Sequence, residues 1–158
     1  MANVFNAAEI IDMGIAKERK RRDFYGLVSA KFKDKKMKDL FSSLRDWEEE
    51  HIRKFTDIRN SVGEMEIRES YQGEFASYIK AMVDDMLYKQ VSASSFSKFV
   101  KNPLSAITIG IGFEKDAILF FGELLKFMPS HNRDAVEKLI EEEKRHIIYL
   151  SELKRKYE

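Results

Sequence analysis

Apolar residues recur at alternating steps of three and four along four long stretches of the chain, which is the spacing of one face of an α-helix. The first predicted helix begins at Asn6, an N-cap residue with Glu9 three positions later, and runs to about Phe32. Asp34 is a second candidate N-cap, for a helix that reaches about Asn60. These two stretches therefore predict a helical hairpin.

The second half of the chain predicts another hairpin. Asn102 followed by Pro103 is a strong helix-start signal, because proline is well tolerated at the first helical position. This third helix should end before Pro129, and the fourth should begin near Ser130 to Asn132 and run almost to the end of the chain. With only 7 Gly and 2 Pro in 158 residues, the composition also favours long helices.

The connection between the second and third helices, residues 61–101, is too long for a plain loop. Within it, residues 73–91 have apolar positions at helical spacing and predict one short extra helix, whereas residues 92–98 (SASSFSK) have the composition of a connector. We therefore predict an all-α fold, a four-helix bundle with a long second connection, formed as a single domain by residues 1–158.

Two of the apolar stripes contain charged or polar residues at their centres. The stripe of the second helix consists of Met37, Leu40, Leu44, Glu48, His51, Phe55 and Ile58. The stripe of the fourth consists of Val136, Leu139, Glu143, His146, Leu150, Leu153 and Tyr157. Each stripe is the face that a bundle helix turns inward, so both Glu-x-x-His pairs are predicted to be buried. Burying an unpartnered carboxylate costs several kcal/mol, so something must compensate its charge.

The first and third helices also resemble each other in sequence. Residues 6–26 and 102–122 match without a gap at an offset of 96, and Glu18 pairs with Glu114. Each of these glutamates lies among apolar residues. The simplest interpretation is a duplicated helical hairpin, in which each half contributes one single glutamate and one Glu-x-x-His.

The two halves, about residues 6–60 and 102–156, together supply six candidate metal ligands: Glu18, Glu48, His51, Glu114, Glu143 and His146. An isolated Glu-x-x-His on a helix is more often a solvated pair than a ligand set, but its duplication in a buried stripe reverses that expectation. Four carboxylates carry about four negative charges, which two divalent cations would neutralise. Oxygen and imidazole ligands suit iron or manganese, and zinc is also compatible with them.

Composition excludes several other classes of site and of partner. The formal net charge is +1, so no overall field favours nucleic acid, and no apolar run is long enough to span a membrane. The absence of cysteine removes disulfides, thiolate metal sites and cysteine nucleophiles. The first residues lack the features of a signal peptide, which predicts a cytoplasmic protein.

The paired glutamates and Glu-x-x-His motifs resemble those of the ferritin-like superfamily, and within it the rubrerythrin-type di-iron proteins, over nearly the whole chain. The resemblance implies two iron ions, with Glu48 and Glu143 bridging them, Glu18 and Glu114 as terminal ligands, and one histidine on each metal. It also implies reduction of peroxide or dioxygen with electrons from an external donor, such as a rubredoxin-like protein.

Two departures from the family pattern affect this expectation. Ile111 stands where rubrerythrins usually carry an additional glutamate, which weakens the expectation of their peroxide-driven ligand switch. A chain without cysteine also cannot build the rubredoxin domain that many of them carry. Two alternatives therefore stay open: a ferroxidase that handles iron, and a bundle whose metal site is purely structural. The long connection would also allow two chains to exchange hairpins in a homodimer.

Several other residues near the motifs have less specific interpretations. Tyr25 lies two turns beyond Glu18, where it could form a hydrogen bond near the metals, relay an electron or simply pack in the core. The basic run at 17–22 (KERKRR) predicts a solvated helix face, with docking of an acidic electron donor as a weaker alternative. His131 is predicted to lie on the surface. Four further acidic residues are predicted to face solvent: Glu49, Glu50, Glu141 and Glu142.

Overall fold

The computed structural model describes residues 6–63, 65, 67, 73–83 and 92–158. Within this part the chain is all-α, as predicted, and has no β-strand. Its helices are α1 (Ala7–Lys31), α2 (Lys35–Val62), α3 (Glu74–Val83), α5 (Phe96–Phe99), α6 (Pro103–Leu125) and α7 (Ser130–Arg155).

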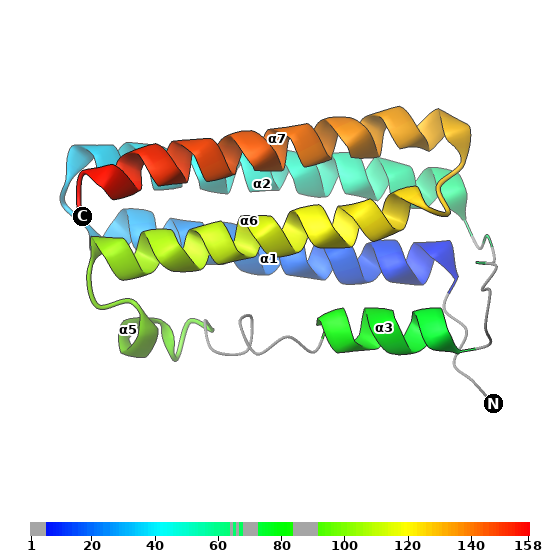
Figure 1. The fold of residues 1–158 in the computed structure, drawn as a ribbon, viewed down its shortest axis with the longest axis horizontal. Helices are drawn as coiled ribbons and strands as arrows, with labels where there is room; N and C mark the ends of the chain where they lie inside the picture. The colour runs from blue at the N-terminus through cyan, green and yellow to red at the C-terminus, as the bar shows by residue number, and fades with distance from the viewer. Residues whose placement is uncertain (1–5, 64, 66, 68–72, 84–91) are drawn as a thin grey trace.

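The four long helices lie side by side as a bundle (Figure 1). Helices α1 and α2 pack extensively against each other as one antiparallel hairpin, and α6 and α7 as the other. The described helices of the long connection, α3 and α5, lie along one side of the bundle (Figure 1). This topology confirms the predicted ferritin-like arrangement.

The helix starts confirm the predicted caps. The Asn6 side chain accepts a hydrogen bond from the Glu9 backbone N–H at 2.9 Å, and the Glu9 side chain accepts one from the Asn6 backbone, which completes a capping box. Asp34 accepts from the Met37 N–H at 3.1 Å, and Asn102 accepts from the N–H of Ser105 at 2.8 Å. These polar caps fix where α1, α2 and α6 begin, and the apolar stripe of each helix determines which face points inward.

The predicted helix in the connection is present as α3, which covers the first half of the predicted range, while residues 84–91 lie outside the described residues. The composition of the stretch 92–98 predicts a connector without a helix. In the structure its last residues instead belong to α5, one turn of helix at Phe96–Phe99. The side chain of Phe96 is buried, so burial of one aromatic ring accompanies helix formation in a serine-rich segment.

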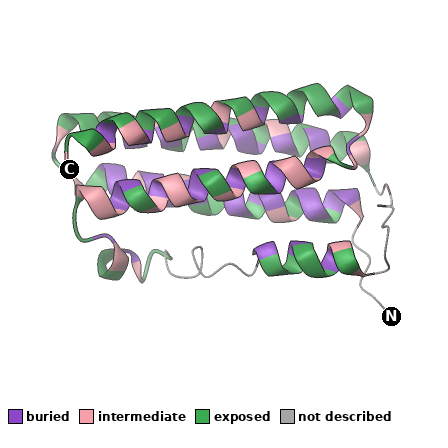
Figure 2. Cartoon of the chain, in the orientation of Figure 1, coloured by how far each residue is buried: buried purple, intermediate pink, exposed green. Residues whose placement is uncertain are grey.

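The buried side chains form two apolar clusters, one toward each end of the bundle, and burial follows the inner faces of the long helices (Figure 2). One cluster includes Ile15, Phe55 and Phe121, and the other includes Phe41 and Leu150. The candidate ligands lie on the helices between these clusters. Among the described residues, no helix is long and apolar enough to cross a bilayer.

A candidate di-metal centre inside the bundle

All six predicted ligands are buried, and the structure brings all six together. Glu18 comes from α1, Glu114 from α6, and the two Glu-x-x-His pairs from α2 and α7. The four glutamates are 0% exposed, and the two histidines at most 4%. The three-residue spacing within each pair places Glu and His one turn apart on the same inner face.

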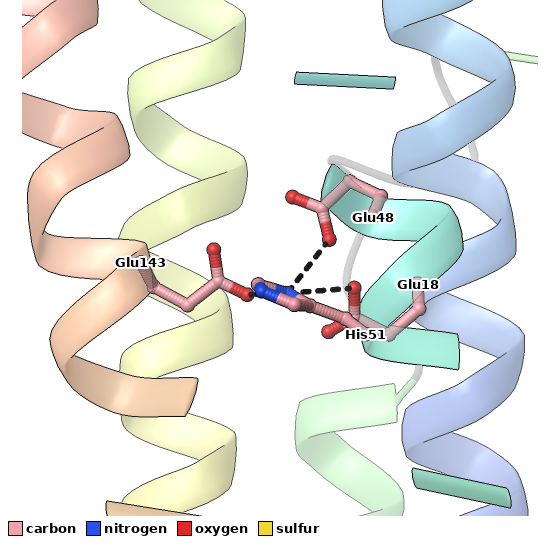
Figure 3. A group of neighbouring side chains, drawn as sticks. All are labelled: Glu18, Glu48, His51 and Glu143. Carbon is pink, nitrogen blue, oxygen red and sulfur yellow. Dashed lines mark hydrogen bonds and ion pairs between the residues drawn. The ribbon is translucent and has the colours of Figure 1, made fainter. Parts of the chain in front are cut away.

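Four of these side chains form what we call the Glu18 half-site: Glu18, Glu48, His51 and Glu143 (Figure 3). The Nδ1 atom of His51 lies 3.0 Å from Oε1 of Glu143, 3.4 Å from Oε2 of Glu48 and 4.0 Å from Oε2 of Glu18. Glu143 reaches this group from α7, on the opposite side of the bundle from α1 (Figure 3).

The second group, which we call the Glu114 half-site, consists of Glu48, Glu114, Glu143 and His146. The Nδ1 atom of His146 lies 2.9 Å from Oε2 of Glu143, 3.5 Å from Oε1 of Glu114 and 3.7 Å from Oε1 of Glu48. In each half-site, one candidate ligand atom from every member lies within 4.8 Å of the others. Glu48 and Glu143 belong to both half-sites, so their carboxylates lie where a residue shared by two ions would have to be.

The unsatisfied polar atoms of this cluster fit a pair of metal ions. Within the described part of the chain, five carboxylate oxygens and one imidazole nitrogen of the cluster are buried and make no hydrogen bond, although Nδ1 of His146 and Oε2 of Glu143 lie 2.9 Å apart as an ion pair. They are Oε2 of Glu18, both oxygens of Glu48, Oε2 of Glu114, Oε2 of Glu143 and Nδ1 of His146. A buried polar atom left unpaired costs about 1–3 kcal/mol, and coordination would remove that cost for each. Carboxylate oxygens with two imidazoles are ligands for iron, manganese or zinc.

Burial strongly affects the protonation of the glutamates when metal is absent. Desolvation raises the pKa of Glu18 well above its ordinary value, against the opposing charge of Arg21. Desolvation and the neighbouring Glu143 raise the pKa of Glu114 to about 8. For Glu143, burial acts in the same direction, but its contacts with Glu114, His146 and His51 outweigh burial and bring its pKa well below the ordinary value.

The two histidines are held in the protonated form when metal is absent. Burial alone would lower their pKa values, but nearby carboxylates outweigh it. The contacts with Glu114 and Glu143 raise the pKa of His146 to about 10, and contacts with Glu142 and Glu143 raise the pKa of His51 well above its ordinary value. Since a metal ligand must be a neutral imidazole, metal binding has to displace these protons.

Tyr25 is fully buried, and its hydroxyl donates a hydrogen bond to Oε1 of Glu114 at 2.6 Å. Burial and the charge of Glu114 raise the pKa of the phenol well above its ordinary value, so it remains a proton donor. The residue at the equivalent place in the other hairpin, Phe121, can make no such bond. Tyr25 therefore touches a candidate ligand in one half-site only.

The basic run at 17–22 is not a uniformly solvated face, and this part of the sequence prediction is wrong. Arg21 is 1% exposed and forms an ion pair with Glu18, and its Nε lies 4.0 Å from Oε2 of Glu48. Lys17 is 4% exposed, and its Nζ contacts Asp116 and the backbone oxygen of Met82, each at 3.0 Å. Arg21 follows Glu18 by one helical turn, so helix phase alone would have indicated its burial.

Glu142 also differs from the prediction of a purely solvated side chain. Its Oε2 accepts a hydrogen bond from Nε2 of His51 at 2.7 Å, and this bond lowers the pKa of Glu142 to about 2. A carboxylate behind a metal-binding imidazole orients the ring and increases its basicity. By contrast, Glu50 and Glu141 are exposed, and Glu49 is half-buried and pairs with Arg22 at 2.7 Å.

A pocket of about 250 Å³ between α2 and α7 leads to the two histidines. Its lining residues are Trp47, Glu50, His51, Lys54, Glu142, Arg145, His146 and Tyr149. The indole of Trp47 stacks on His146 with ring centroids 5.0 Å apart and an interplanar angle of 11°. The sequence does not predict this aromatic contact. It joins α2 to α7, and the rotation of one helix relative to the other is not evident from the sequence. The pocket is the side from which a small molecule can approach the cluster.

The family model for rubrerythrin matches residues 9–154 of the chain. The chain belongs to the rubrerythrin family. Its fold is similar to the crystal structure of a ferritin-like diiron-carboxylate protein from Thermotoga maritima, with a TM-score of 0.72 and 21% sequence identity over 100% of both chains. No curated protein sequence matches the chain. Family and fold together support a non-haem di-iron protein.

Two further positions matter for the comparison with other rubrerythrins. Ile111, the position at which the resemblance implies an additional glutamate in rubrerythrins, is half-buried and packs against the apolar cluster that contains Phe41. That place is therefore filled by a side chain that cannot bind metal. His131 is exposed, as predicted from its place near the start of α7.

Proposed function

We propose that this protein is a non-haem di-iron oxidoreductase that reduces peroxide or dioxygen with electrons from an external donor. One observation carries the proposal: four carboxylates and two imidazoles from four helices converge, buried, into two half-sites that share Glu48 and Glu143. The rubrerythrin family supports the choice of iron and of redox chemistry. Manganese and zinc fit the same ligands and are alternatives for the metal.

The iron pair, when bound, would supply two electrons and Lewis acidity to a bound oxygen species. The residues of the chain set the conditions for this chemistry. Glu48 and Glu143 would hold the two ions together, while Glu18 and Glu114 would each complete one half-site. Tyr25 keeps a proton on its hydroxyl, 2.6 Å from Glu114, in a position where it stabilises that carboxylate as charge changes.

The shape of the approach favours a small substrate. The pocket of about 250 Å³ adjoins both histidines, while the helices and the two apolar clusters bury the rest of the centre. Peroxide and dioxygen are small enough for such an opening, and a bulky organic substrate would be held away from the carboxylates. These 158 residues contain no cysteine and so cannot themselves form a rubredoxin-type centre, and we propose a rubredoxin-like donor as the source of the electrons.

The deciding experiment combines metal analysis with a stoichiometric reaction. The protein is loaded with Fe(II) without oxygen and mixed with hydrogen peroxide. Reduction of one peroxide to two waters consumes two electrons and two protons, so we expect one peroxide consumed for every two iron ions oxidised. Subsequent addition of reduced rubredoxin should restore the starting optical spectrum. The Glu18→Ala, Glu114→Ala double variant is the control and should lose both metal and peroxide consumption.

Two other outcomes would assign a different function. Continuous turnover of added Fe(II), with assembly into a cage, would identify a ferroxidase. Metal that raises the melting temperature without any redox cycling would identify a structural site. Either result would overturn the proposed peroxide chemistry while leaving the ligand assignment in place.

A further inference from the structure

Four rings follow one another from the surface of the protein to the candidate metal ligands, and we call them the ring stack: Tyr149, Trp47, His146 and His51. The imidazoles of His51 and His146 are nearly parallel, with centroids 5.6 Å apart and an interplanar angle of 14°. The Trp47 indole stacks on His146 at 5.0 Å and 11°, and the Tyr149 ring lies 5.7 Å from Trp47 at 36°. The ring stack therefore connects the imidazoles of both half-sites to the aromatic side chains of the pocket.

The outer rings of the stack are exposed, whereas the inner rings are buried. Tyr149 is 40% exposed and Trp47 37%, but His146 is 4% exposed and His51 only 1%. The indole of Trp47 is thus in contact with solvent and with a candidate ligand at the same time. Tyr25 also contacts a candidate ligand, but its ring is 0% exposed and provides no comparable path to the surface.

The duplicated hairpins differ at the two aromatic positions of the stack. Glu143 follows Glu48 by 95 positions, and at this offset Trp47 corresponds to Glu142 and Tyr149 to Lys54. Glu142 and Lys54 also contact each other, with Nζ of Lys54 3.3 Å from Oε1 of Glu142. Equivalent places across the α2–α7 interface therefore hold two rings in contact on one side and an ion pair on the other. An ion pair has no π orbitals, so the aromatic side is the one suited to electron transfer.

We propose that the electrons of the external donor enter the protein at Trp47 and Tyr149 and reach the metal centre through His146. Electron tunnelling weakens steeply with distance, and rings in close contact provide overlapping π orbitals along the path. Two one-electron donors are oxidised for each pair of ferric ions reduced to ferrous, and the rings are left chemically unchanged. This inference rests on the proposed function, which requires an external donor. Trp47 acts through His146 and is therefore an electron-transfer residue that does not itself touch the substrate.

The surroundings of Trp47 fit a protein donor that binds without strong electrostatic steering. Trp, Tyr and Arg side chains are enriched in protein interfaces, and the exposed Arg145 lines the same pocket as Trp47 and Tyr149. Apart from the histidines, each of the two pockets that Trp47 lines contains two acidic and two basic side chains. Because these charges balance, ionic strength should change the rate of reduction little. A steep fall with salt would indicate docking at the exposed Arg19 and Lys20 and would overturn entry at Trp47.

The test is the anaerobic re-reduction of the oxidised, iron-loaded protein by reduced rubredoxin, followed by stopped-flow absorbance of the donor. Variants are compared at equal iron content. Trp47→Leu should lower the limiting rate at saturating donor by about tenfold or more, and Trp47→Phe, which keeps a ring in the stack, should restore most of it. Tyr78→Leu is the matched control, because Tyr78 is 42% exposed but lies on α3, outside the ring stack. Its rate should equal that of the unmodified protein.

A second measurement does not depend on turnover. Trp47 is the single tryptophan of the chain, so its fluorescence reports directly on the ring stack. The metal-free protein is titrated with Co(II), whose open d shell quenches an excited indole in electronic contact with a ligand. Co(II) should therefore quench the emission much more strongly than Zn(II), whose d shell is closed. Equal effects of Co(II) and Zn(II) at equal occupancy would overturn the electronic contact between Trp47 and the centre.

The outcomes separate this inference from the proposed function. If the unmodified protein consumes peroxide but Trp47→Leu is re-reduced as fast, electrons enter elsewhere and only this inference is overturned. The same conclusion holds if Trp47→Leu raises only the donor concentration for half-saturation, because Trp47 would then be a docking contact. Tyr149→Leu removes the outermost ring and gives the same test if Trp47→Leu does not fold. If the unmodified protein consumes no peroxide, the proposed function itself is refuted.

Discussion

Trp47 and Glu142 occupy equivalent positions in the two hairpins, and each contacts the histidine of the opposite hairpin. Each residue directly precedes the glutamate of its Glu-x-x-His motif. Trp47 on α2 stacks on His146 of α7, and Glu142 on α7 accepts a hydrogen bond from His51 of α2. The two hairpins therefore place Trp47 and Glu142 alike, but the two side chains differ in chemistry. The imidazole of His51 contacts a carboxylate, whereas the imidazole of His146 contacts an indole.

This difference predicts that Glu142 strengthens metal binding at His51. Glu142→Gln keeps the size of the side chain but removes the charge that accepts the Nε2 proton of His51. Loss of such an outer partner typically reduces metal affinity by about 10–100-fold, and we expect that range for the ion bound by His51. Competition against a chelator with Co(II) measures it.

Glu141→Gln is the matched control, because Glu141 is the preceding residue, is exposed and pairs with Lys144 at 2.6 Å. Its affinity for metal should stay within about twofold of the unmodified protein. If Glu142→Gln and Glu141→Gln bind metal equally well, the hydrogen bond to His51 has no role in the centre.

The sharing of two carboxylates predicts a difference in metal stoichiometry. Glu143 belongs to both half-sites and Glu114 to one. Glu143→Gln should therefore weaken the binding of both ions, while Glu114→Gln should leave one ion bound with nearly unchanged affinity. Metal analysis after dialysis against a weak chelator gives the number of ions retained. If the Glu143→Gln and Glu114→Gln variants retain the same number of metal ions, Glu143 is not shared by the two half-sites.

Much of the fold and the burial of the candidate ligands could be predicted from the sequence, because helical periodicity and capping are local properties. Asn6, Asp34 and Asn102 mark helix starts through side-chain bonds to residues three positions away. The 3.6-residue period then places Glu48 and Glu143 in phase with the apolar residues of α2 and α7, which is the face that packs inward. A buried glutamate among apolar neighbours then points to a compensating cation.

The residues around the ligands were harder to predict, because their contacts depend on how the helices are rotated and spaced. Glu142 is one residue out of phase with the buried stripe, and only the approach of α2 to α7 brings it to His51. Lys17 and Arg21 lie within a run of six residues of which five are basic, and local charge density favoured a solvated face. The contact of Lys17 with Asp116 of α6 requires the tertiary fold, whereas the burial of Arg21 could have been predicted from its helix phase relative to Glu18.

The raised pKa values predict that the metal-free protein becomes less stable as pH rises. His146, with a pKa of about 10 in the folded protein against an ordinary 6.5, contributes stability that is present below pH 6.5 and lost as pH rises through 10. Glu114, raised to about 8 from 4.5, binds a proton in the folded state that the unfolded chain has released, so its contribution also falls up to pH 8. The free energy of unfolding should decrease between about pH 6 and 9, by at most ~1.4 kcal/mol per pH unit for each proton involved, and the melting temperature should decrease with it.

Metal should reverse this trend, since bound ions replace the protons on these ligands and bind more tightly as pH rises. The difference in melting temperature between loaded and metal-free protein should therefore widen with pH, as measured by calorimetry in matched buffers. His146→Gln removes one of the titrating groups and should reduce the slope of stability against pH in the metal-free protein. A metal-free melting temperature that rises over this range would contradict the raised pKa values.

Two helix glycines predict opposite effects of the same substitution. A Cβ atom at Gly14 would lie 2.8 Å from Cε1 of Phe120, a ring that is 1% exposed and packed edge-on against Phe121. At Gly122, nothing in the described part of the chain lies within 4 Å of an added Cβ. Gly14→Ala should destabilise the protein by about 1–2 kcal/mol, because overpacking outweighs the gain in helix propensity. Gly122→Ala should stabilise it by about 0.5–1 kcal/mol, since only that gain applies.

Urea unfolding of the two metal-free variants measures both changes in the free energy of unfolding. Circular dichroism of each folded variant checks its secondary structure. The double variant Gly14→Ala, Phe120→Leu should recover part of the loss, because the shorter side chain withdraws the ring atoms that the new methyl group meets. Equal effects of alanine at Gly14 and at Gly122 would show that helix propensity alone governs these positions. In that case α1 would pack less closely against Phe120 of α6 than it does in the structure.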